Sequence, residues 1–123
     1  MKNKEFIEQT KQFFEECVNV MNIKGREYAG DQEDDKFANF KRVAKLQGIP
    51  VTSAWFTYFI KHFDSLTSFI RKRNQGMSVS EIEMGLSEPI SGRIGDMINY
   101  LFILNGIIDE EREAEKNKIK ERS

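Results

Sequence analysis

Apolar residues recur along this chain at intervals of three and four, the spacing of one face of an α-helix. Over residues 4–26 one such stripe holds Phe6, Thr10, Phe13, Cys17 and Val20, and charged or amide side chains lie outside it. No segment alternates apolar and polar residues with the period of two that a β-strand requires. The pattern therefore predicts an all-α protein.

Capping and turn residues divide this pattern into four main helices and a short one. The first is expected over residues 4–26, and the second carries Phe37 to Leu46 and stops at Gly48, a residue suited to a left-handed helix end. The third begins at a cap on Thr52 or Ser53 and closes with the basic run 71–73. Residues 78–86 form a short helix or a structured loop.

The last main helix is apolar on most sides. Ser87 is its expected N-cap, and Pro89 lies in its first turn, where the missing N–H costs nothing. A helix of this kind is buried centrally or lies in a subunit interface, so the sequence predicts a homodimer. Its main stripe is heptad-like and consists of Ile90, Ile94, Met97, Leu101, Leu104 and Ile108.

Size and composition narrow the class of protein. The chain has 123 residues, 39% of them hydrophobic and 32% charged, which fits one folded domain over residues 1–108 and a charged, solvated helical extension over 109–123. A net charge of −1 makes a nucleic-acid partner unlikely. Cys17 is the only cysteine, so we expect no intrachain disulfide and a reduced, cytoplasmic setting. No apolar run is long enough to span a membrane.

Polar residues interrupt the apolar pattern on the last helix. Arg93, Asp96 and Asn99 are spaced to share one side of it, and an aspartate in apolar surroundings costs free energy unless it is paired, hydrogen-bonded or bound to metal. Two interpretations stay open. Either Arg93 and Asp96 form a structural ion pair with Asn99 bonded to a neighbour, or these residues belong to a binding site. His62, the sole histidine, would join such a site only if it lay close to Asp96.

Four short motifs stand out along the chain: Lys24-x-x-Glu27-Tyr28-Ala29-Gly30, Phe37-x-Asn39-Phe40, Lys61-His62-x-Asp64-Ser65 and Gly95-Asp96-x-x-Asn99-Tyr100. Together they resemble the nucleotide-modification-associated domain of many small phage and prophage proteins. That family is distantly similar to the all-α, MazG-like nucleotide pyrophosphohydrolases, which are oligomeric and hold Mg²⁺ with clustered carboxylates.

The resemblance implies a phage-type protein that binds a nucleotide. In the sharper version it is a Mg²⁺-dependent hydrolase that converts a nucleoside triphosphate to a monophosphate and pyrophosphate. The implied catalytic residues are Glu27, His62 and Asp96, and the implied metal ligands are Glu27, Glu88 and Asp96. The implied nucleotide contacts are Tyr28, Asn39, Lys41, Arg42, Lys61, Arg93, Asn99 and Tyr100.

The sequence departs from the MazG pattern in its acidic residues. Arg93 stands where a glutamate would be, and His62 with Ser65 replaces an acidic pair on the third helix. This departure bears on hydrolysis more than on nucleotide binding, and it leaves the question of catalysis open. Two other classes remain: a non-catalytic protein that sequesters a nucleotide signal to counter host defence, and a helical module that inhibits a host protein through the last helix.

Overall fold

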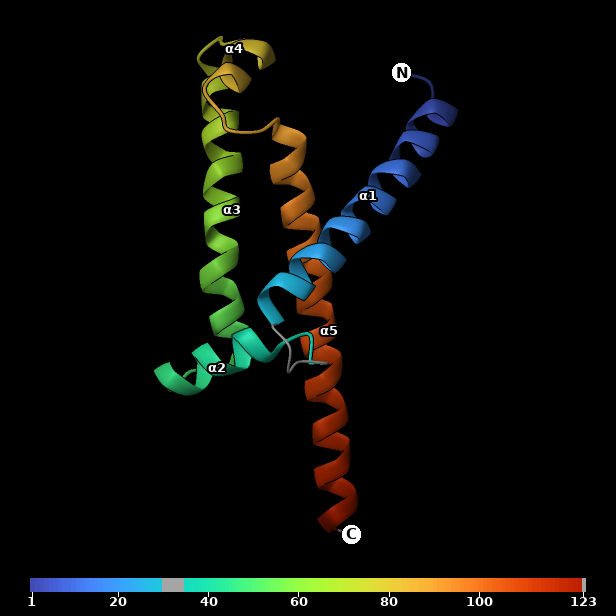
Figure 1. The fold of residues 1–123 in the computed structure, drawn as a ribbon, viewed down its shortest axis with the longest axis vertical. Helices are drawn as coiled ribbons and strands as arrows, with labels where there is room; N and C mark the ends of the chain where they lie inside the picture. Colours follow the sequence, from blue (N-terminus) through green and yellow to red (C-terminus); the bar gives the residue numbers. More distant parts are fainter. Residues whose placement is uncertain (30–34, 123) are drawn as a thin grey trace.

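Five α-helices make up the computed structural model, which describes residues 1–29 and 35–122, with the backbone alone for residues 25–29 (Figure 1). No strand occurs among these residues, so the predicted all-α bundle of four main helices and a short one is confirmed. None of the described helices is long and apolar enough to cross a membrane. The helices are α1 (Asn3–Ala29), α2 (Ala38–Gln47), α3 (Val51–Asn74), α4 (Val79–Met84) and α5 (Ile90–Arg122).

The antiparallel pair of α3 and α5 forms the body of the molecule (Figure 1). At its lower end Phe40 of α2, Trp55 of α3 and Ile107 of α5 make the buried core. The indole Nε1 of Trp55 donates a hydrogen bond to the backbone oxygen of Tyr100 at 2.7 Å, which ties the two long helices together inside this core. At the other end, α4 packs against α3.

Helix α1 crosses α5 and packs on it through its middle part. The crossing is close at Gly95, where a Cβ atom would lie 3.3 Å from the Cys17 sulfur, and Cys17 is buried as its place on the apolar stripe predicts. Next to it the rings of Phe14 and Phe102 meet edge to face, 5.7 Å apart. The N-terminal half of α1 stands away from the other helices, and Phe6 is more than half exposed there.

Several helix ends differ from the sequence-based expectations. Gly48 does end α2 in the left-handed conformation, with φ 66°. By contrast, α3 begins directly after Pro50 without a side-chain cap, so the predicted cap on Thr52 or Ser53 is wrong. The N–H of Ile90, the first residue of α5, donates to Glu83 of α4 at 2.8 Å. A carboxylate from the preceding helix thus takes the place of the predicted Ser87 cap.

The first helix runs from Asn3 to Ala29, three residues beyond the predicted end at residue 26. The short helix does form, and it carries a complete capping box in which Ser78 and Glu81 each accept a hydrogen bond from the other's backbone N–H. The charged extension is helical as expected, because α5 continues without a break to Arg122, and every residue from 109 to 122 is exposed.

Candidate functional site

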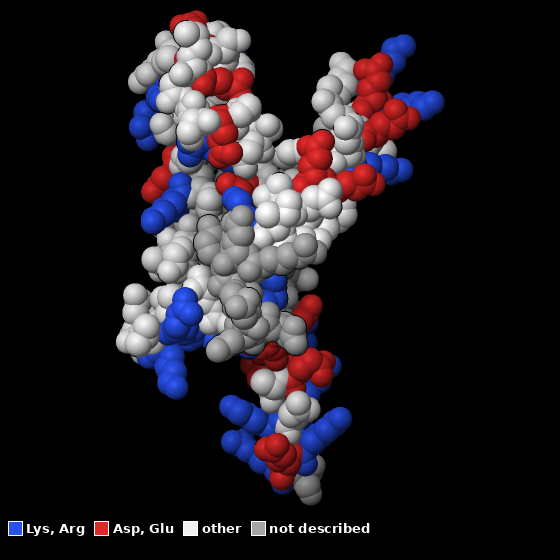
Figure 2. Space-filling view, viewed as in Figure 1, with Lys and Arg blue, Asp and Glu red and all other residues white. Residues whose placement is uncertain are grey.

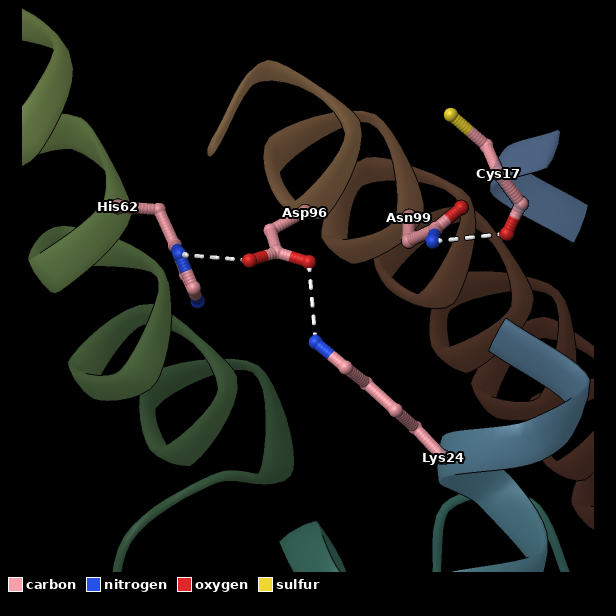
Figure 3. Close-up of polar contacts among 5 residues, drawn as sticks. All are labelled: Cys17, Lys24, His62, Asp96 and Asn99. Atoms are coloured by element: carbon pink, nitrogen blue, oxygen red, sulfur yellow. Dashed lines mark hydrogen bonds and ion pairs between the residues drawn. The ribbon is translucent and has the colours of Figure 1, made fainter. Parts of the chain in front are cut away.

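Three helices bring charged side chains together around Asp96 (Figure 3). One carboxylate oxygen lies 3.2 Å from the Lys24 amino group of α1, and the other lies 4.0 Å from Nδ1 of His62 on α3. The Asp96 side chain is 20% exposed and that of Lys24 is 50% exposed, so the group is reachable from solvent. The condition under which His62 would join the site, a position close to Asp96, is therefore met.

Burial keeps His62 neutral near physiological pH. It lowers the pKa of the imidazole below its ordinary value, and the nearby cations Lys24 and Arg93 act in the same direction. The carboxylates of Asp96 and Glu88 oppose this shift without overcoming it. A neutral imidazole 4.0 Å from a carboxylate is a weak contact, so Lys24 is the main electrostatic partner of Asp96.

Arg93 does not hold Asp96. Its guanidinium Nη1 donates to the hydroxyl of Ser65 on α3 at 2.6 Å, one helical turn away from the Asp96 carboxylate. The proposed structural ion pair between Arg93 and Asp96 is therefore wrong. The guanidinium Nε is buried without a hydrogen-bond partner among the described residues.

Asn99 has a structural role. Its side-chain amide donates to the backbone oxygen of Cys17 at 2.9 Å, which fastens α1 to α5 beside the Asp96 group (Figure 3). The first of the two interpretations of the polar residues on this helix predicted such a bond from Asn99 to a neighbouring element. Tyr100 borders the same region, because its ring lies 4.7 Å from the His62 ring and also contacts Phe40.

The predicted nucleotide contacts on α2 lie in a different group. Asn39 accepts a hydrogen bond from Arg42 at 2.6 Å, which is a local pair on one helix. Lys41 binds two carboxylates, Asp35 before α2 and Glu110 on α5, and these raise the pKa of its amino group. The structure does not bring these three residues together with Asp96.

Two other predicted residues lie at the edge of the Asp96 group. Lys61 is exposed on α3 one residue before His62, about 100° around the helix from it. Glu88 precedes α5 and acts on His62 electrostatically. The side chains of Glu27 and Tyr28 lie outside the described residues. Among the described residues no three His, Cys, Asp or Glu side chains gather where they could hold a metal ion.

The sequence-based list of site residues missed two partners. Lys24 was noted only as part of a motif and Ser65 only as a substitute for an acidic residue, yet they are the direct partners of Asp96 and Arg93. A signal for Lys24 was present, because it opens the polar stretch at the end of the first apolar stripe. Ser65 carried a weaker one, since it lies one turn after His62 on the same side of its helix.

No protein-family model matches the sequence, and no curated protein or solved structure matches it at a significant level. The resemblance to the phage nucleotide-modification-associated domain therefore stays a prediction.

Proposed function

We propose that this protein binds the phosphate groups of a nucleotide at the group formed by Lys24, His62, Arg93 and Asp96. The observation that carries the proposal is the convergence of Lys24, Arg93, Asp96 and the His62 imidazole from three helices at a partly exposed place. Lys24 offers an accessible ammonium group, and the Arg93 guanidinium adds a second positive charge near His62. Both are donors suited to phosphate oxygens.

The described residues do not by themselves fit a Mg²⁺ site. Mg²⁺ takes oxygen ligands in octahedral geometry, and Asp96 is the one carboxylate at the centre of the group, already paired with Lys24. Hydrolysis through the predicted ligands Glu27, Glu88 and Asp96 therefore stays a prediction. Binding without catalysis, as in sequestration of a nucleotide signal, needs only the cations described above.

The proposal is tested by titrating the protein with ribo- and deoxyribonucleoside triphosphates and with pyrophosphate in a calorimeter, each with and without Mg²⁺. Lys24→Gln should weaken binding by about tenfold, because it removes a charge-assisted contact to phosphate. Lys45→Gln is the matched control, since it removes an exposed lysine from the end of α2 and should leave the affinity unchanged. Equal effects of the two substitutions would argue against this site.

Asp96→Asn separates the two versions of the proposal. Loss of a Mg²⁺-dependent increase in affinity, together with loss of pyrophosphate release, would support the hydrolase. Unchanged or tighter Mg²⁺-independent binding would support a binder, because the substitution removes a negative charge beside the phosphate. Absence of binding, and of copurified nucleotide in mass spectra, would contradict both and favour the protein–protein module. We further propose that the protein acts as a homodimer of phage or bacterial origin.

A further inference from the structure

Large apolar side chains remain exposed along both long helices of the body. On α3 they occur at steps of four, three and seven, and on α5 at steps of seven, which is the spacing of a helix–helix contact. Each is 38–53% exposed. We call this set the α3–α5 face: Phe56, Ile60, Phe63 and Ile70 of α3, with Ile94, Leu101 and Ile108 of α5.

The two rows lie on the same side of the helix pair. On α3, Phe63 follows His62, and on α5, Ile94 follows Arg93; His62 and Arg93 both point between the two helices. A step of one residue turns the side chain by about 100° around its helix. Because α3 and α5 are antiparallel, this turn carries both rows toward the same side of the pair. Together the rows form one apolar surface.

This surface lies away from α1. Helix α1 packs on α5 at Gly95 and Asn99, which are turned by 100° or more from the row of Leu101. Charged side chains are absent from the two rows, whose intervening positions hold Thr67 on α3 and Ile98 and Asn105 on α5. By contrast, charged residues crowd the N-terminal half of α1 and the last turns of α5 in Figure 2.

The exposed area of the chain is too large for a monomer of its size. A folded chain of 14.4 kDa exposes roughly 6,800 Å², whereas this chain exposes 9519 Å², an excess of about 2,700 Å². Part of the excess belongs to the ends of α1 and α5. Half of the excess exposed area, about 1,350 Å² for each chain, still falls within the range of area that stable homodimers bury.

We propose that a second copy of this chain covers the α3–α5 face. The same rows from two chains pack around a two-fold axis, so that α3 and α5 of one copy and α3 and α5 of its partner make a four-helix bundle. Because Asp96 lies on another side of α5, between α3 and α1, the two Asp96 groups of the dimer stay open to solvent. The proposal does not depend on nucleotide binding, because the chain can dimerise without binding a nucleotide or bind one without dimerising.

Sedimentation of the full chain over protein concentrations of about 1–100 µM tests this assignment. The wild-type protein should sediment as a dimer. Leu101→Glu should raise the dissociation constant by roughly 1,000-fold, because the two-fold interface buries the new carboxylate twice without a partner. Leu101→Ala is the milder variant and should raise the dissociation constant by roughly tenfold. It keeps the test informative if the glutamate variant fails to fold.

Two matched substitutions locate the interface. Leu46→Glu places the same charge on an exposed apolar residue of α2, and Phe6→Glu places it on the free half of α1. Both variants should remain dimers. A wild-type chain that sediments as a monomer would overturn the proposal and leave the face to a different protein. Dissociation by Phe6→Glu but not by Leu101→Glu or Leu101→Ala would also overturn it.

Discussion

Gly106 is the residue at which the packing of α5 leaves least room. A Cβ atom there would lie 2.6 Å from the Phe37 ring, which packs against the core of Phe40, Trp55 and Ile107. Gly106→Ala should therefore lower the free energy of unfolding by about 1–3 kcal/mol, measured by urea denaturation. The Phe37 ring would have to move to make room for the new methyl group, because the backbone of α5 cannot.

Gly92→Ala is the matched control for that substitution. Its Cβ would also lie 2.6 Å from a neighbour, but this neighbour is the end of the flexible, exposed Glu88 side chain. The glutamate can turn away, and the gain in helix propensity, up to about 1 kcal/mol, should leave this variant as stable as the wild type or slightly more so. Similar losses for both variants would contradict the close packing at Phe37.

The sequence identified which residues of the site needed partners better than it identified those partners. An aspartate amid apolar residues indicated that Asp96 must be compensated, and this is confirmed. The nearest candidate in sequence, Arg93, was a natural choice because the two are one turn apart. The actual partner, Lys24, is 72 positions away and reaches Asp96 only because α1 crosses α5 at Gly95. Contacts of that kind depend on tertiary packing, which local spacing does not encode.

Among the elements, α5 combines two different surroundings along a single helix. Up to Ala114 it contacts the rest of the chain, because Glu110, Glu111 and Ala114 line a hollow with Phe37 and Val51. Beyond Ala114 every described residue is exposed. Removal of residues 115–123 should therefore change the free energy of unfolding by no more than about 0.5 kcal/mol.

A longer truncation tests where that extension begins. Removal of residues 109–123, the predicted boundary, also deletes Glu110, which binds Lys41, and one wall of the hollow. It should cost roughly 1 kcal/mol more than the shorter truncation. Equal stabilities of the two truncated chains, compared by urea denaturation, would show that the boundary at residue 108 is the better one.

Helix positions were predictable from the sequence, and helix starts were less so. Apolar spacing located all four long helices, and Gly48 marked a C-terminus because few other residues adopt a positive φ. Helix starts were misplaced where a local side chain was assumed to supply the cap. At α5 the acceptor is Glu83, seven residues before Ile90 on a separate helix, and α3 begins after Pro50 with no side-chain cap. The acceptor at the start of α5 thus comes from a separate helix, and at the start of α3 the backbone oxygen of Pro50 accepts from Ser53 and Ala54, so neither end uses the local side-chain cap that the sequence pattern suggested.

At the scale of the whole molecule, burial within one chain is sparse. In the part of the chain that the structure describes, seven hydrophobic residues are buried, and two of them are alanines. So small a core supplies little hydrophobic free energy against the conformational entropy of 123 residues. The α3–α5 face would add the missing burial if two chains share it. Folding and association should then be linked.

Linked folding makes the melting temperature depend on protein concentration. A hundredfold increase in concentration stabilises a dimer that dissociates on unfolding by about 2.7 kcal/mol. With an unfolding entropy of roughly 0.5 kcal/mol/K for two chains of this length, the melting temperature should rise by about 5 °C. Differential scanning calorimetry at the two ends of that range measures the shift. Leu101→Glu should melt at a lower temperature that no longer changes with concentration, whereas Leu46→Glu should keep the wild-type dependence. A wild-type melting temperature that stays constant would show that the chain folds alone despite its exposed apolar face.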